Sequence, residues 1–136
     1  MSDYCYVEVT VSEEDKDIAI NTIKDYNEIT HNNDGTINII VYKGDYGLAD
    51  ELQKLANNGV NFVYSHEAGG NYGPCVGACV NGEIVECNAD FDGNPVVTFP
   101  PTYQISQKEI DICKKYYSTL KKFYNIVKQR RSGGIR

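Results

Sequence analysis

Residues 4–11 read YCYVEVTV, and this stretch decides the class of fold. Small apolar side chains at Cys5, Val7, Val9 and Val11 alternate with polar or aromatic ones. Because successive side chains of a strand point to opposite faces, this period of two predicts a half-buried β-strand. The chain therefore begins with a sheet that has one covered face, and the segments that follow must supply the cover.

Outward from this strand, helical and extended patterns alternate. The expected elements are a helix at about 12–25, strands at 28–31 and 36–42, a helix at 48–57 and a strand at 60–64. Their order, β-α-β-β-α-β, resembles the ferredoxin-like split βαβ sandwich, and we predict such a core over about residues 4–64. That fold hosts enzymes, regulators and RNA binders alike, so it carries no function by itself.

Asn81-Gly82 is the strongest turn signal in the chain and predicts a β-hairpin within an extension at about 75–99. Two-residue pairing places one set of side chains on a mainly apolar face, and the opposite set comprises Cys75, Gly77, Cys79, Ile84, Glu86 and Asn88. Val96–Phe99 is expected to add a short edge strand. The predicted fold class is therefore α+β.

The last segment, about 106–130, is predicted to be a long amphipathic helix. Apolar side chains recur there every three or four residues, at Ile110, Cys113, Tyr117, Leu120, Tyr124 and Val127. An apolar stripe of this length must pack on the chain's own sheet or on a second copy, so a homodimer through the C-terminal helix is one expectation.

Length and charge bound the function. The 136 residues suit one domain, and the formal net charge is −6. Residues 1–106 hold 17 acidic and 4 basic side chains, whereas residues 107–136 hold 2 acidic and 9 basic ones. Because an acidic body repels phosphates, direct nucleic-acid binding is disfavoured. The basic segment is expected to dock back on the body, to attract an anionic partner or to stay solvated.

We expect a cytoplasmic protein that makes no membrane contact. No run of about 18 apolar residues could span a bilayer, and the N-terminus lacks the basic-then-apolar order of a signal peptide. The five cysteines are an odd number, which indicates reduced thiols rather than a disulfide framework.

The densest group of reactive side chains lies at 64–75. His66 and Cys75 form a candidate base and nucleophile, with Asp90 or Asp92 as the orienting carboxylate. No recognised local motif surrounds Cys75, so no catalytic residue is favoured, and the simpler interpretation is a surface loop that leads into the hairpin. Three glycines of the same loop form a candidate nest for a small ligand or anion, namely Gly69, Gly70 and Gly73.

Neither a metal nor another cofactor is expected from the sequence. Zinc would need Cys75, Cys79 and Cys87 with His66, but residues four apart on a strand are separated by about 13 Å, too far to share an ion. The run Asn88-x-Asp90-x-Asp92-Gly93 matches the start of a calcium loop, yet Phe99 stands where the bidentate Glu belongs. We therefore predict an Asx-rich turn there.

The predicted function is that of a small acidic, non-enzymatic binding or inhibitor protein. Eleven tyrosines supply contact area, and Tyr4 and Tyr6 lie opposite the predicted core. The expected partner is a protein, basic or nucleic-acid-binding, whose phosphate channel the acidic face would occupy by mimicry. The candidate binding residues are Tyr4, Tyr6, Glu8, His66, Glu67, Tyr72, Asp90 and Asp92.

In size, charge and composition the chain resembles phage- or mobile-element-encoded inhibitors of host defence, including anti-CRISPR proteins. The resemblance implies an inhibitor and assigns no residues. Two alternatives stay open: a thiol-dependent hydrolase or transferase that uses Cys75 and His66, and a small-ligand-binding protein that uses the Gly-rich loop.

Overall fold

The computed structural model describes residues 4–69, 72–98, 101 and 104–133. Its elements in chain order are β1 (Tyr4–Ser12), the 3₁₀ turn η1 (Glu13–Asp15), α1 (Lys16–Thr22), β2 (Glu28–His31), β3 (Thr36–Asp45), the 3₁₀ turn η2 (Tyr46–Leu48), α2 (Ala49–Asn57), β4 (Phe62–His66), β5 (Cys75–Val80), β6 (Glu83–Asn88) and α3 (Gln107–Gly133).

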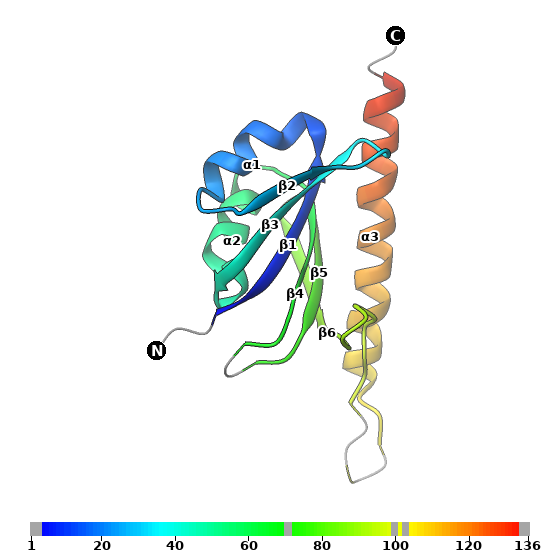
Figure 1. The fold of residues 1–136 in the computed structure, drawn as a ribbon. Coiled ribbons are helices and arrows are strands. Elements are labelled where there is room, and N and C mark those ends of the chain that lie inside the picture. The colour runs from blue at the N-terminus through cyan, green and yellow to red at the C-terminus, as the bar shows by residue number, and fades with distance from the viewer. Residues whose placement is uncertain (1–3, 70–71, 99–100, 102–103, 134–136) are drawn as a thin grey trace.

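The strands form one six-stranded sheet in the order β2-β3-β1-β4-β5-β6, and every neighbouring pair is antiparallel. α1 and α2 lie on one side of the sheet and the long α3 lies on the other (Figure 1). The predicted mixed α+β class is thereby confirmed. The specific ferredoxin-like topology is not confirmed, because the sheet continues through the predicted hairpin and its strand order differs from that of a four-stranded sandwich.

The side of the sheet under α1 and α2, which we call the α1–α2 face, holds the larger core. Val7, Val9 and Val11 of β1 are fully buried there, as the alternation in residues 4–11 predicts. Leu52 and Leu55 of α2 close over them. The first strand pairs with β3 and β4 on its two sides, so it lies at the centre of the sheet with its apolar side chains covered on the α1–α2 face.

The opposite side, the α3 face, is only partly covered. Val76, Ala78 and Val80 of β5 pack against Tyr116 and Phe123 of α3. The main contacts of α3 with the sheet are with β4, β5 and β6, so this helix covers half of the sheet. The outer half, formed by β1, β3 and β2, carries partly exposed side chains: Tyr6, Glu8, Thr10, Glu28, Thr30, Asn38 and Tyr42.

The predicted apolar stripe of α3 is wrong by one position in its aromatic members. Tyr117 and Tyr124 are 54% and 40% exposed, whereas their neighbours Tyr116 and Phe123 are 6% and 1% exposed. The doublets Tyr116-Tyr117 and Phe123-Tyr124 each offer two adjacent stripes. The helix turns the stripe of Tyr116 and Phe123 toward the sheet, and of the second doublet this buries the ring that has no hydroxyl to satisfy. The buried stripe packs on the chain's own sheet, so a dimer through α3 would use its exposed side.

Basic side chains of α3 pair with the acidic body. Arg130 approaches the Asp15 carboxylate at 2.9 Å and the Glu14 carboxylate at 3.7 Å, and Lys115 approaches Glu83 at 2.9 Å. Arg131 donates to the Asn33 carbonyl at 2.8 Å. Pairs this exposed contribute at most about 1 kcal/mol each, so they orient the helix while the apolar stripe holds it.

Two predicted segments differ in the structure. The helix expected at 12–25 is shorter, because η1 takes up its first turn and the chain leaves the helical conformation at Ile23. The edge strand expected at Val96–Phe99 is absent from its described part, residues 96–98. Pro95, just before it, makes an isolated bridge with Ala89, Val96 donates its N–H to the Asn88 carbonyl at 2.9 Å, and Phe99 lies outside the described residues. No helix in the described part of the chain has the length and apolarity needed to cross a membrane.

Truncation of Phe123 tests which stripe of α3 is buried. We expect Phe123→Ala to lower the free energy of unfolding by about 3–5 kcal/mol, since the ring is fully enclosed, and Tyr117→Ala to change it by less than about 1 kcal/mol. Urea unfolding at two protein concentrations measures both. Equal losses in the two variants, or a loss that depends on protein concentration, would show that the stripe is not packed on the chain's own sheet.

Candidate functional site

Both candidate cavities meet at His66 and Cys75. His66 ends β4 and Cys75 begins β5, and the two residues pair directly across the ladder. One cavity, of about 380 Å³, extends over the α1–α2 face, and another, of about 350 Å³, extends toward the open half of the α3 face. The end of the β4–β5 pair is therefore the place where the chemistry-bearing side chains of the predicted loop gather.

On the α1–α2 face, His66 and Cys75 are joined by Glu86 of β6. The ligating atoms of these three side chains all lie within 4.8 Å of one another. Glu86 pairs with Gly77, two residues along β5 from Cys75, so its side chain emerges on the same face. The third group beside the predicted Cys–His pair is thus Glu86, and the structure records no bond from Asp90 or Asp92 to His66.

Gly77 makes the position of Glu86 possible. A Cβ atom at Gly77 would lie 2.3 Å from the ring of Tyr64, which crosses the glycine from β4. The Tyr64 hydroxyl then donates a hydrogen bond to the Glu86 carboxylate. Burial, and next the bond to Glu86, raise the pKa of Tyr64, so this hydroxyl stays a donor.

The imidazole of His66 is fixed on three sides. Its Nδ1 lies 2.9 Å from the carbonyl oxygen of Glu67, and the ring of Tyr72 meets it edge-on with centroids 5.3 Å apart. On the remaining side, a Cβ at Gly47 would lie 2.8 Å from the ring, so only glycine fits there. With Nδ1 donating to a carbonyl, Nε2 is the nitrogen left free to accept a proton or a metal.

The wall of this cavity contains a strained segment. Tyr46, Gly47 and Leu48 all have positive φ, at 51°, 66° and 63°, although two of them carry side chains. Each left-handed non-glycine residue costs on the order of 1–2 kcal/mol, which the surrounding packing must offset. Buried Leu48 anchors this turn to the core, and the turn presents Gly47 to His66.

The thiol of Cys75 is protonated near neutral pH. Burial, and next the charge of Glu86, raise the pKa of Cys75 to about 11. A catalytic cysteine needs the opposite shift, because the thiolate is the nucleophile. The electrostatics therefore weaken the thiol-enzyme alternative even though Cys75 and His66 are brought together.

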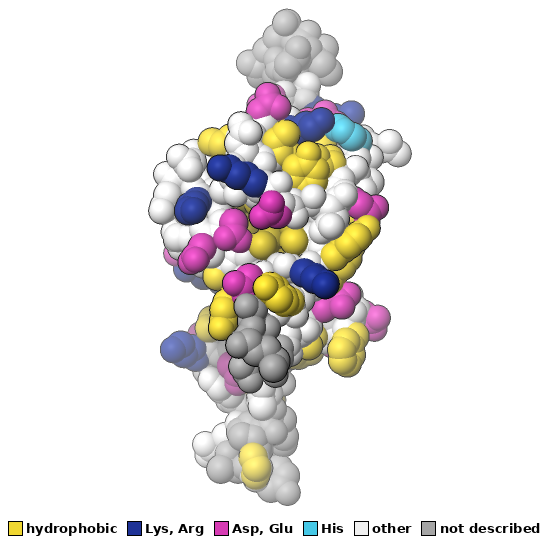
Figure 2. All heavy atoms as spheres, turned by 60° about the vertical axis from the view of Figure 1, so that its left-hand side comes forward, with side chains coloured by type: hydrophobic (Ala, Val, Ile, Leu, Met, Phe, Trp, Pro, Cys, Tyr) yellow, Lys and Arg dark blue, Asp and Glu magenta, His cyan; other side chains and the backbone are white. Residues whose placement is uncertain are grey.

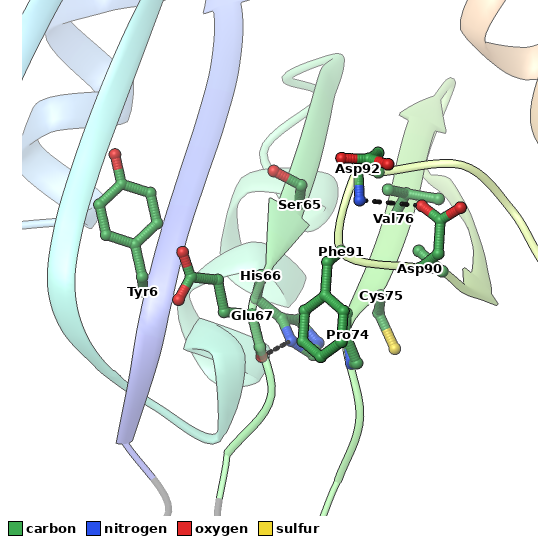
Figure 3. A pocket seen from close by; sticks show the side chains of 12 residues that line it. Tyr6, Ser65, His66, Glu67, Pro74, Cys75, Val76, Asp90, Phe91 and Asp92 are labelled. Carbon is green, nitrogen blue, oxygen red and sulfur yellow. Dashed lines mark hydrogen bonds between the residues drawn. The ribbon is translucent and has the colours of Figure 1, made fainter.

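The second cavity is acidic and aromatic. Figure 3 shows Tyr6 and Glu67 on one side, Asp90 and Asp92 on the other, and Phe91 between them in this view. The ring of Phe91 is 92% exposed. Neither Lys nor Arg occurs among the described residues that line this cavity.

Tyr6 lies in the electrostatic field of several carboxylates. Its ring stacks on Tyr42 with centroids 6.2 Å apart, and the Tyr42 hydroxyl donates to Glu28. The pKa of Tyr6 is raised by burial and then by the charges of Glu8, Glu28 and Glu67. Three carboxylates from three separate segments thus act on one tyrosine.

Of the eight predicted binding residues, five line the acidic cavity: Tyr6, His66, Glu67, Asp90 and Asp92. Tyr72 lines the cavity on the α1–α2 face, Glu8 borders a groove beside Tyr116, and Tyr4 lies in a separate cavity with Lys24 and Lys43. The Asp90 carboxylate accepts the backbone N–H groups of Asp92 and Asn94, which is the predicted Asx turn. These bonds lower the pKa of Asp90.

The Gly-rich loop folds on itself in its described part. Gly69 donates its N–H to the Tyr72 carbonyl, and a Cβ at Gly69 would lie 2.3 Å from the Tyr72 ring. Gly70 lies outside the described residues. The residues that sequence reasoning missed are Glu86, Tyr64, Tyr42, Glu28 and Phe91.

Comparisons with known proteins give no relative. No family model, curated protein or solved structure matches the chain. The function must therefore be inferred from the geometry of the site.

Replacement of Gly77 tests whether Tyr64 lies across β5. We expect Gly77→Ala to lower the free energy of unfolding by about 1–3 kcal/mol, because the methyl group would displace a ring that is 3% exposed and hydrogen-bonded. Gly73→Ala, where the added Cβ meets nothing within 4 Å, is the control and should stay within about 0.5 kcal/mol. Similar values for the two variants in chemical denaturation would refute the placement of Tyr64.

Alkylation kinetics test the electrostatics of Cys75. With a pKa of about 11, the thiolate fraction at pH 8 is low and rises with pH until that value is passed, so iodoacetamide should modify Cys75 at least about tenfold more slowly than a free cysteine. Peptide mass spectrometry in buffer with EDTA resolves Cys75 from the other four thiols. A rate that is already maximal at pH 7 would mean an activated thiolate and would revive the enzyme alternative.

Proposed function

We propose that this protein is a binding protein that takes up a cationic segment, rich in Arg or Lys, of a protein partner. The surface responsible, which we call the acidic cleft, comprises Tyr6, Glu8, Glu28, Tyr42, Glu67, Asp90, Phe91 and Asp92. The observation that carries the proposal is a cavity beside Tyr6 that is lined by Glu67, Asp90 and Asp92 and has no basic residue in its described lining. Burial and then the charges of Glu8, Glu28 and Glu67 raise the pKa of Tyr6, in keeping with this acidic surrounding.

The chemistry of the cleft suits a guanidinium or ammonium group. An Arg side chain stacks on a tyrosine face while its N–H groups pair with carboxylates, and both partners are present around Tyr6. The exposed ring of Phe91 adds an apolar contact at the rim. Clustered carboxylates also accelerate the encounter with a cationic partner, in a way that salt weakens.

Away from the acidic cleft the surface charge is mixed. On the face seen in Figure 2, which is the side where α1 and α2 lie in Figure 1, carboxylates lie among lysines and apolar side chains and form no single acidic field. This favours recognition of one cationic segment over mimicry by the whole surface. A basic nucleic-acid-binding protein offers such a segment, and its occupation would inhibit that partner, so the inhibitor role and the likeness to anti-defence proteins are kept as part of the proposal.

A thiol-dependent hydrolase or transferase is the second candidate. Its support is the convergence of Cys75 and His66 with Glu86 in place of an aspartate. The raised pKa of Cys75 counts against it.

We also propose the finer description of the fold as a ferredoxin-like unit at about 4–64 that the hairpin extends. Its support is the common face of α1 and α2 and the order β2-β3-β1-β4 among the first four strands, although the order of the whole six-stranded sheet is different.

Charge neutralisation tests the acidic cleft. The triple variant Glu8→Gln, Glu28→Gln, Glu67→Gln should bind a fluorescent octa-arginine peptide at least about tenfold more weakly than the unmodified chain, because each lost carboxylate removes an ion pair with the peptide. Fluorescence anisotropy at about 150 mM salt measures the affinity, and a neutral glutamine peptide gives the background.

The matched control neutralises three carboxylates away from the cleft, by Glu13→Gln, Asp17→Asn and Asp50→Asn. Both triple variants change the net charge equally, from −6 to −3. Since exposed charges farther than about 8 Å are screened at this salt, the control should lose no more than about threefold. Equal losses in the two variants would show that the peptide reads net charge and not the cleft.

A further inference from the structure

The cluster of His66, Cys75 and Glu86 lies outside the acidic cleft's carboxylates and is not used by the proposed function. It is the one group of three or more His, Cys, Asp or Glu side chains with converging ligand atoms among the residues that the structure describes. The three groups come from three adjacent strands, so backbone hydrogen bonds hold their origins in place. A preformed set of nitrogen, sulfur and oxygen donors is suited to bind a metal ion.

The distances are close to those of a metal site. Zinc binds sulfur at about 2.3 Å and nitrogen or oxygen at about 2.0–2.2 Å, which in a tetrahedron separates neighbouring ligand atoms by roughly 3.3–3.8 Å. The atoms of this cluster lie within 4.8 Å of one another, so each pair must close by about 1.5 Å at most. Side-chain rotation alone can supply that, because the backbone already sets the three residues on one face.

The surroundings orient the donors as the outer contacts of metal sites do. Nδ1 of His66 is held by the Glu67 carbonyl, which leaves Nε2 as the donor atom, and Tyr64 holds the carboxylate of Glu86. In metal proteins, partners of this kind fix the tautomer of a ligating histidine and the orientation of a ligating carboxylate. Gly77 and Gly47 provide the space for this arrangement, since a side chain at either would strike Tyr64 or His66.

The donor types select the metal. One imidazole nitrogen, one sulfur and one carboxylate oxygen suit zinc, whereas calcium and magnesium take oxygen donors. The adjoining cavity of about 380 Å³ leaves room for a fourth ligand. Three protein ligands with one open position are typical of zinc sites that bind water or an exogenous ligand.

We propose that His66 Nε2, Cys75 Sγ and a carboxylate oxygen of Glu86 bind a zinc ion, with the fourth position open to the cavity on the α1–α2 face. Binding replaces the proton of the Cys75 thiol, which leaves to solvent, and forms one bond from each of the three side chains to the ion. Two other cysteines lie away from this site: Cys87 points to the α3 face, and Cys79 is fully buried four residues along β5. Cys5 lies on the α1–α2 face, where its sulfur accepts a hydrogen bond from the Tyr72 hydroxyl at 3.3 Å, and it is not one of the three converging donors.

Titration of the full chain with zinc tests the site. Tag-free protein, treated with chelator and reductant and then desalted, should bind one zinc ion with a dissociation constant of about 1 μM or below in isothermal titration calorimetry, and neither Mg²⁺ nor Ca²⁺ should compete. Co²⁺ serves as the spectroscopic probe, because a thiolate ligand gives a sulfur-to-cobalt charge-transfer band in the near ultraviolet. Absence of zinc binding, or of this band, would overturn the proposal.

Matched variants locate the ion. Cys75→Ser and His66→Gln should each weaken zinc binding at least about tenfold, while Cys113→Ser and His31→Gln, which replace a thiol and an imidazole outside the cluster, should leave it unchanged. Glu86→Gln changes an exposed side chain and so keeps the fold, which far-ultraviolet circular dichroism checks. A charge-transfer band that survives in Cys75→Ser, or zinc affinity unaffected by Glu86→Gln, would place the ion elsewhere and refute the assignment.

Tyr64 is assigned as a positioning residue for Glu86. Tyr64→Phe should weaken zinc binding about tenfold and keep the cobalt–thiolate band, because the ligands remain while the carboxylate loses its hydrogen bond. The two proposals can be refuted independently. The triple variant at Glu8, Glu28 and Glu67 should keep full zinc affinity, and Glu86→Gln should keep full affinity for the octa-arginine peptide.

Discussion

Backbone hydrogen bonds between β4, β5 and β6 set His66 opposite Cys75 and Tyr64 opposite Gly77, and the whole site depends on that register. A slip of one residue in either ladder would turn the alternate side chains to the other face and disperse the cluster. The register is well fixed, because Phe62 and Tyr64 are buried on one face while Val76 and Ala78 are buried on the other. Packing on both faces thus positions groups that are themselves polar.

The single helix on the α3 face explains why the same sheet has a second, different surface. α3 packs on β4, β5 and β6 through its apolar stripe and leaves β1, β3 and β2 uncovered on that side. Its arginines approach Asp15 and Asn33 at one end of the body, away from the acidic cleft. The basic helix therefore neutralises part of the acidic body, and its arginines are engaged with Glu14, Asp15 and Asn33.

Local patterns predict most of the elements, and the turn at Asn81-Gly82 predicts that Cys75 and Glu86 share one face of the hairpin, as the observed pairing has them. What local patterns could not supply was the neighbour of that hairpin. No residue between 66 and 75 specifies that β4 pairs with β5, so the opposition of His66 and Cys75 and the crossing of Gly77 by Tyr64 are tertiary facts. The prediction of the buried aromatic residues of α3 was wrong for a related reason. Either member of each doublet fits a helical period, and only packing against the sheet selects which one is buried.

The central claim is the register of the β4–β5–β6 ladder, and interstrand backbone nuclear Overhauser effects measure it directly in solution. The account predicts contacts that pair His66 with Cys75, Tyr64 with Gly77, and Gly77 with Glu86. A ladder displaced by one residue, with Ser65 facing Cys75 or Gly77 facing Val85, would contradict it. In that case neither the donor cluster nor the position of Tyr64 would survive.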